Sequence, residues 1–231
     1  RMYLAASKAN ADICICNINV FFQNAGIVKH HLPIEWLSRP IVRIDEQPKF
    51  YRNLTICNKL FRRGFLEAHS IAFPEEGFHE DQSFVVQAYT LANAISCVSD
   101  SLYFYRKQRV GSVSSNPAHG AFDVFPVMQK IRKFLEGVDD GIGRQEVIAQ
   151  IAAQRYLQLF NVLPIDCKRE FFKKMKAEFI LAPLIARVDL LSPVEFRQYN
   201  IICRHDYFVS LLLLRLNSFS IRVRKAVYRR L

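Results

Sequence analysis

A change of pattern near residue 121 divides this chain of 231 residues into two parts. Before it, short runs rich in β-branched and aromatic residues alternate with helical patterns, and after it only helical patterns occur. The predicted strands are residues 12–22, 41–44, 55–61, 95–98 and 101–106, the last two as separate strands. The predicted helices are residues 1–10, a helix from Glu80, residues 125–135, 144–163 and 168–179, a helix from Pro193, and residues 206–231. We therefore expect an α/β domain over residues 1–120 and an α-helical region over residues 121–231.

Composition narrows the class of protein and its partners. Hydrophobic residues make up 51% of the chain, which is enough for a sizeable core. The formal net charge of +11 indicates anionic partners, namely phosphates, anionic lipid or nucleic acid. No apolar stretch reaches the roughly 18–20 residues that a bilayer-spanning helix needs. The best candidate, residues 207–216, is too short and contains Arg215.

The six cysteines do not form a metal motif. Only Cys14 and Cys16 lie close together, within an apolar run, and there is no Cys-x-x-Cys pair or His/Cys cluster with zinc spacing. This usage is typical of buried, reduced thiols in a cytosolic protein. We expect no metal site in this chain.

An acidic pair, Glu80-Asp81, stands at the start of a helical pattern. Apolar residues recur after it at steps of three and four, which predicts a strongly amphipathic helix. These residues are Phe84, Val85, Ala88, Leu91, Ala92 and Ile95. The helix dipole and free N–H groups stabilise an ionised carboxylate at such an N-terminus. That position suits a permanently ionised base, and it equally suits a plain helix start.

Two further segments flank this pair, and the three together carry a resemblance. They are Asn58-Lys-Leu-Phe-Arg-Arg63, Phe73-Pro-Glu-Glu-Gly-Phe-His-Glu-Asp-Gln-Ser-Phe84 and Leu102-Tyr-Phe-Tyr-Arg-Lys-Gln-Arg-Val-Gly-Ser-Val-Ser114. In this order they resemble the second half of family 2 glycosyltransferases, inverting enzymes of bacterial polysaccharide and cell-envelope synthesis. Gly77 is displaced by one position from the family pattern. The resemblance covers roughly residues 1–116, and it implies half of a GT-A type domain, a mixed sheet with flanking helices.

The resemblance implies that Asp81 is the catalytic base. Inverting transfer needs a base beside the acceptor hydroxyl, opposite the leaving nucleoside diphosphate. Glu80 would orient the acceptor or support Asp81. Because the two residues are adjacent, their side chains are not expected to work as the paired carboxylates of a hydrolase.

Other site residues follow from the same resemblance. The loop after the last predicted strand would close over the nucleotide, and its cations and hydroxyls would stabilise the charge on the leaving diphosphate. The residues concerned are Arg106, Arg109, Ser112 and Ser114. The alternative is a basic, solvated turn after an edge strand. Asn58, Lys59 and His79 are candidates for binding the acceptor, although a lysine at a strand end is usually solvated and a single loop histidine usually binds nothing.

The family's Asp-x-Asp metal motif is not found in this chain. The resemblance places Arg1 shortly after that motif, and the chain opens in mid-helix, so we expect a preceding segment. The ligands of the divalent cation, Mg or Mn, would lie there, and this chain alone is not expected to catalyse transfer. The implied partners are a nucleotide-sugar donor and a saccharide or lipid-linked acceptor.

The C-terminal residues form a basic amphipathic pattern. One face carries Leu212, Leu216, Phe219, Val223 and Val227, and another carries Arg222, Lys225 and Arg229. This helix either docks on an anionic membrane, where lipid-linked acceptors lie, or packs on its own domain. Docking would place the protein in the cytoplasm, peripheral at the inner face of the cell membrane.

Two other classes remain as alternatives. The charge of +11 also suits a nucleic-acid-binding module. The sequence contains no helix-turn-helix, zinc finger or RNA-binding aromatic signature, so we expect no nucleic-acid partner. The other alternative is a non-catalytic protein that associates with membrane surfaces.

Overall fold

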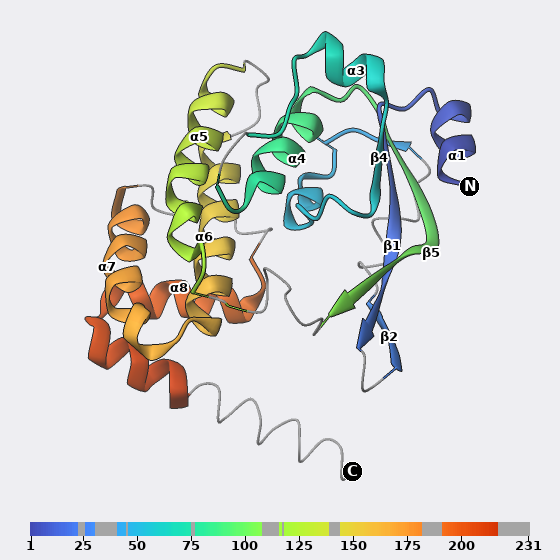
Figure 1. Cartoon of the computed structure of the whole chain (residues 1–231). Coiled ribbons are helices and arrows are strands. Elements are labelled where there is room, and N and C mark those ends of the chain that lie inside the picture. The colour runs from blue at the N-terminus through green and yellow to red at the C-terminus, as the bar shows by residue number, and fades with distance from the viewer. Residues whose placement is uncertain are drawn as a thin grey trace. The chain divides into compact units, whose positions relative to one another are not determined.

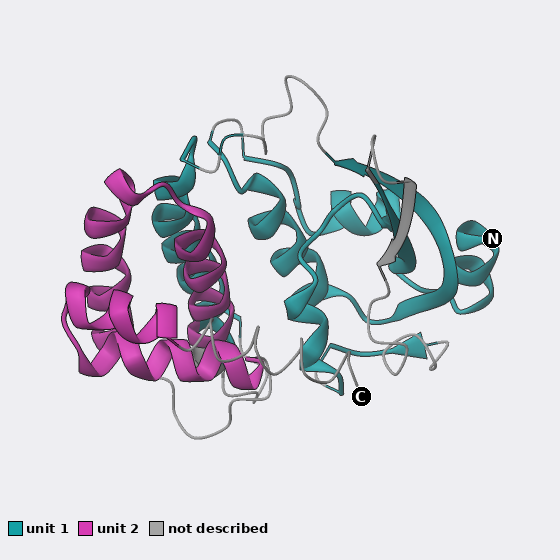
Figure 2. Cartoon of the chain, turned by 90° about the horizontal axis from the view of Figure 1, so that it is seen from below, with its two compact units in different colours: residues 1–148 teal, residues 149–231 magenta. Residues whose placement is uncertain are grey.

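The computed structural model describes residues 1–22, 26–30, 41–44, 46–74, 77–107, 116, 118–138, 144–181 and 191–216. The chain forms two compact units, coloured separately in Figure 2. The sheet unit is Arg1–Ile148 and the helical unit is Ala149–Leu231. The expected boundary near residue 120 thus differs from the division after Ile148. Helix α5 (Val124–Glu136) accounts for the difference, because it packs against a helix of the sheet unit.

A mixed sheet of five strands forms the centre of the sheet unit. The strands are β1 (Ile13–Phe22), β2 (Gly26–His30), β3 (Ile41–Val42), β4 (Lys59–Phe61) and β5 (Ile95–Lys107). Strand β1 is parallel to β5 and antiparallel to β2 and β4, and β3 pairs antiparallel with β5. Figure 1 shows β1 and β5 as the two long strands side by side. The prediction of an α/β fold with a mixed sheet and flanking helices is confirmed.

The prediction of two strands at 95–98 and 101–106 is wrong, because β5 is continuous. Its register against β1 shifts between Cys16 and Ile18. The Asn17 side chain donates a hydrogen bond to the Ser99 carbonyl oxygen at 2.7 Å. The polar residues Ser99 and Asp100 therefore lie in a bulged part of one strand, which bends without ending.

Helix α4 (Glu80–Leu91) lies between α5 and the sheet (Figure 1). We expected a one-sided amphipathic helix, but α4 is buried on most of its circumference. Its buried residues are Gln82, Ser83, Phe84, Val85, Val86, Ala88 and Tyr89. The second apolar face exists because α5 covers it. The short helix η1 (Pro48–Arg52) also reaches α4, and the rings of Phe50 and Tyr51 meet the edge of Tyr89.

Two further helices complete the sheet unit around the strands. Helix α1 (Met2–Lys8) packs on β1 and β5. Helix α3 (Arg63–Ala68) is a short helix that follows β4.

The helical unit is built from α6 (Arg144–Val162), α7 (Ile165–Leu181), α8 (Pro193–Arg204) and a helix over residues 207–216. The unit boundary falls within α6. Aromatic rings fill its core: Phe179 contacts both Tyr156 and Tyr199, and Phe160 contacts Phe172. The predicted helices at 144–163, 168–179 and from Pro193 are confirmed. Residues 217–231, which carry most of the predicted basic amphipathic pattern, lie outside the described residues. Within the described part of the chain, no helix has the length and apolarity that crossing a membrane requires.

Candidate functional site

Aromatic contacts join the first two motif segments. The Phe61 ring, at the end of β4, meets the Phe84 ring edge-on at 5.2 Å between centroids. Phe84 lies in the first turns of α4, and its ring also stacks on Phe73 at 4.2 Å. The strand end and the chain that leads into the acidic pair are therefore held together by three rings.

Cys57 connects the third segment to the first. Its thiol shares a hydrogen bond with the Tyr103 side chain on β5. Burial raises the pKa of the Cys57 thiol, the Lys59 ammonium opposes that rise, and the Asp81 carboxylate adds to it. Lys59 lies two residues after Cys57, and Tyr103 lies within hydrogen-bond reach of its thiol. Residues of the first and third segments thus meet at Cys57.

Glu80 and Asp81 occupy the first turn of α4. Glu80 is exposed and Asp81 is half-buried. His79 precedes them with φ of 66°, the left-handed region that few side chains adopt. Its Nδ1 shares a hydrogen bond of 3.0 Å with the Gln82 side chain. This contact fixes the histidine along the helix start, next to the acidic pair.

The loop before α4 is clamped to the chain that precedes α5. The Phe78 backbone N–H donates to the Asp123 carboxylate at 3.2 Å, and the Phe78 ring meets the His119 ring edge-on at 4.6 Å. Gly120 lies directly against the Phe78 ring, with φ of 68°. These contacts position the residues just before Asp81.

Asn58 and Lys59 are engaged within the protein. Asn58 is 1% exposed, and its Nδ2 donates to the Cys16 carbonyl oxygen at 2.7 Å. The Lys59 ammonium donates to Asn58 Oδ1 at 3.0 Å and to the Thr55 carbonyl oxygen. It also lies over the Tyr89 ring, 5.5 Å from the centroid. Asn58 therefore has a structural role, and acceptor binding by these two residues and by His79 stays a prediction.

Arg106 is the one described member of the predicted diphosphate-binding set. It lies exposed near the end of β5, paired in register with Phe21 of β1. Arg109, Ser112 and Ser114 lie outside the described residues.

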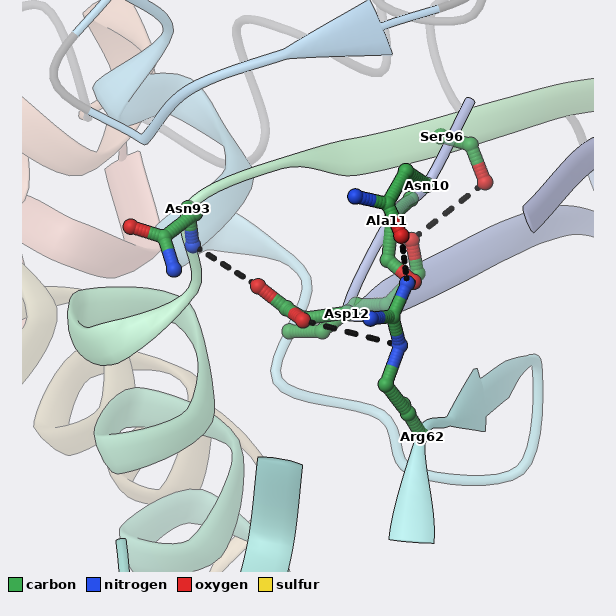
Figure 3. Close-up of polar contacts among 7 residues, drawn as sticks. Asn10, Ala11, Asp12, Arg62, Asn93 and Ser96 are labelled. Carbon is green, nitrogen blue, oxygen red and sulfur yellow. Dashed lines mark hydrogen bonds and ion pairs between the residues drawn. The ribbon is translucent and has the colours of Figure 1, made fainter. Parts of the chain in front are cut away.

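Arg62, from the first motif segment, organises a cluster of polar contacts shown in Figure 3. Its guanidinium donates to Asn10 Oδ1 at 2.8 Å and to the Ala11 carbonyl oxygen at 3.1 Å. The Asp12 carboxylate lies 3.7 Å from Arg62 Nε and accepts the Asn93 backbone N–H at 3.0 Å. The cluster ties the end of β4 to the starts of β1 and β5, so Arg62 stabilises the frame that carries the site.

Two buried asparagines were not foreseen from the sequence. Asn17 and Asn19 on β1 are 2% and 8% exposed, and within the described residues Oδ1 of each lacks a hydrogen-bond partner. Buried amide oxygens are usually satisfied, so each can accept a hydrogen bond from a hydroxyl. Asn17 is paired with Ser101, two residues from Tyr103. The signal was available, because two asparagines interrupt an otherwise apolar strand pattern.

A metal site is not found in the described parts of the chain. Those residues contain no group of three or more His, Cys, Asp and Glu side chains arranged to hold a metal. The described residues therefore do not fit a divalent-cation centre.

No family model matches the chain. Its sheet and flanking helices nevertheless match solved structures of one class of protein, as follows. Among solved structures, it is similar to the crystal structure of S. aureus TarS residues 1–349 in complex with UDP-GlcNAc. The TM-score is 0.61 at 21% identity, over 95% of this chain and 62% of that one. The complex of the same protein with UDP gives 0.57 at 18% identity, over 87% and 60%. The chain therefore has the fold of these glycosyltransferase structures.

Curated relatives are glycosyltransferases as well. The poly(ribitol-phosphate) β-N-acetylglucosaminyltransferase TarS of Staphylococcus aureus strain Mu50 is 39% identical over 74 residues, 32% of this chain and 13% of TarS. EpsH of Bacillus subtilis strain 168, a putative glycosyltransferase by name, is 44% identical over 116 residues, 45% of this chain and 31% of EpsH. The matches thus span less than a third of each relative's length.

Proposed function

We propose that this chain is the acceptor-side part of an inverting, family 2-type glycosyltransferase of polysaccharide or cell-envelope synthesis. It would transfer a sugar from a nucleotide-sugar donor to a hydroxyl of a saccharide or lipid-linked acceptor. The observation that carries this proposal is the packing of the first two motif segments, in which Phe61 of the first meets Phe84 of the second and so holds the end of β4 against the start of α4. The similarity to glycosyltransferases supports it independently.

The proposed reaction is a single displacement. The Asp81 carboxylate accepts the proton of the acceptor hydroxyl as its oxygen forms a bond to the anomeric carbon. The bond from that carbon to the diphosphate breaks on the opposite face, so the configuration inverts. Glu80 orients the acceptor, with Asn58, Lys59 and His79 as candidates to hold it.

The leaving group is anionic, so cations and hydroxyl donors near it lower the barrier. Arg106 lies exposed near the end of β5 and would act with Arg109, Ser112 and Ser114. The TarS crystals contain UDP-GlcNAc or UDP, which supports a uridine diphosphate sugar as the donor here. We assign the other contacts to the donor, and any Mg or Mn that neutralises the diphosphate, to residues outside the described part of this chain.

Asp81→Asn tests the assignment of the base in the full-length protein as encoded. Transfer from UDP-N-acetylglucosamine should fall by about 10²–10⁴-fold, because the amide cannot accept the proton. The thermal midpoint of unfolding should change little, since the shape is retained. Glu67→Gln is the matched control, because Glu67 is an exposed acid paired with Arg63 on α3. Transfer by Asp81→Asn at the wild-type rate would contradict the assignment.

A further inference from the structure

The helix over residues 207–216 presents apolar side chains to solvent. Of its residues only Ser210 is buried. The exposed large side chains are Phe208 at 68%, Val209 at 40%, Leu212 at 59% and Leu216 at 58%. Phe208, Leu212 and Leu216 recur every four residues, so they form one stripe along the helix.

The stripe is held in place by the opposite side of the same helix. The Tyr207 ring meets the Phe172 ring of α7 at 5.5 Å, and Ser210 Oγ donates to the Ile201 carbonyl oxygen at 3.4 Å. Asp206 caps the helix, because its carboxylate accepts the Val209 N–H at 3.0 Å. The apolar exposure therefore belongs to a helix packed on α7.

Cations lie beside the stripe. The Arg169 guanidinium on α7 lies over the Phe208 ring, 5.7 Å from its centroid. Arg215 directly precedes Leu216 on the same helix, and burial together with the charge of Arg215 lowers the pKa of Lys168 on α7. Two acids close in sequence have partners of their own: Asp206 in the cap, and Glu170 with Lys174 at 3.7 Å.

We propose that this surface docks on an anionic lipid bilayer. The docking surface comprises Phe208, Val209, Leu212 and Leu216 with Arg169 and Arg215. A bilayer interface accepts both components at once, since apolar side chains enter the acyl boundary while cations remain among anionic headgroups. Nucleic acid offers negative charge to the cations, but it has no apolar layer in which the side chains of the stripe could be buried. The inference stands apart from sugar transfer, and it holds whether or not Asp81 is the base.

The test is flotation of the protein with vesicles of phosphatidylcholine alone or mixed with phosphatidylglycerol. The wild type should bind the mixed vesicles, and more weakly as salt increases. Arg169→Gln with Arg215→Gln should lower partitioning roughly thirtyfold, at about fivefold for each charge. Phe208→Ser with Leu212→Ser and Leu216→Ser should lower it at least as much.

Matched controls lie elsewhere on the surface. Val162→Ser with Ile165→Ser and Ile180→Ser removes three side chains that are 58%, 55% and 65% exposed. Lys130→Gln with Lys133→Gln removes two exposed cations of α5. Both controls should keep wild-type partitioning.

A second readout does not depend on the triple variant folding. Phe208→Trp should show a blue-shifted emission with phosphatidylglycerol vesicles, after subtraction of the wild-type signal from Trp36. The proposal is overturned by any of four results: no vesicle binding, equal binding to phosphatidylcholine, controls that lose as much, or a stripe variant that only abolishes self-association.

Discussion

Gly120 is the residue on which the loop before Asp81 depends most directly. Its φ of 68° suits glycine, and a Cβ there would overlap the Phe78 ring. The Phe78 ring also meets His119 edge-on, so it cannot turn away from Gly120 without losing that contact. The absence of a Cβ at Gly120 thus lets the Phe78 ring pack closely and helps to position the start of α4.

Gly120→Ala should therefore destabilise the sheet unit by about 1–3 kcal/mol, from the backbone strain and the overlap with Phe78. Urea unfolding followed by circular dichroism measures the change. Gly64→Ala is the control, because a Cβ at Gly64 in α3 would meet nothing within 4 Å. That variant should gain about 0.5–1 kcal/mol from helix propensity. Equal effects of the two substitutions would show that the clamp does not matter.

Two buried asparagines of the site should respond oppositely to the same substitution. Asn58→Leu removes the hydrogen bond to the Cys16 carbonyl oxygen and should cost about 1–3 kcal/mol. Asn19→Leu replaces an amide whose Oδ1 has no partner in the described structure, so the free energy of unfolding should stay level or rise. Thermal unfolding of the ligand-free protein measures both. A large loss for Asn19→Leu would mean that its amide has a structural role.

At the scale of elements, α8 has a well-defined start. Ser192 Oγ accepts the Glu195 N–H at 3.3 Å, and the Glu195 carboxylate accepts the Ser192 N–H at 2.7 Å. Pro193 stands at the first helical position, where its missing N–H costs nothing. This capping box stabilises a helix that contributes Tyr199 and Ile202 to the core of the helical unit.

Ser192→Ala should lower the free energy of unfolding by about 1 kcal/mol, since the Glu195 N–H loses its acceptor. Ser192→Asp keeps an acceptor oxygen at the cap and should restore most of that loss. Chemical denaturation of the three proteins gives the comparison. If the alanine and aspartate variants are equally stable, the cap does not contribute.

Local signals were sufficient to predict most elements but not their surroundings. Asp12–Phe22 reads as a strand because β-branched and aromatic residues dominate it, and Glu80 begins a helix as expected. The bulge at Ser99 and Asp100 looked like a break, because polar residues end most strands and the Asn17 contact that holds them is far away in sequence. The burial of α4 on several sides depends on α5, which no local pattern reveals.

At the scale of the whole molecule, the resemblance in the three segments predicted the fold better than composition did. Spacing could not show that Phe61, Phe84 and Phe73 join two of the segments, or that Arg62 holds the frame. Two asparagines in an apolar strand pattern were a visible signal at Asn17 and Asn19, but sequence does not state which polar groups lack partners. Tertiary contacts assemble the site, whereas local patterns supply only its parts.

The sheet itself leads to the last prediction, because in the described structure β4 pairs on one side only, with β1. Beside this edge lies a cleft of ≈ 250 Å³ whose lining includes Tyr3, Ala6 and Leu60. Tyr3 is 72% exposed and Leu60 39%. A strand edge next to apolar side chains is a template for pairing with another chain. We therefore expect the 231-residue chain to self-associate as its concentration rises.

Leu60→Lys should shift that association to higher concentration, because a charge on an edge strand opposes pairing. Ile180→Ser, at a residue 65% exposed in the helical unit, is the control and should leave it unchanged. Light scattering coupled to size-exclusion chromatography measures the mass of each protein. Two results would show that the β4 edge does not mediate association. The wild-type chain could stay monomeric at all concentrations, or Leu60→Lys could leave its association as strong as before.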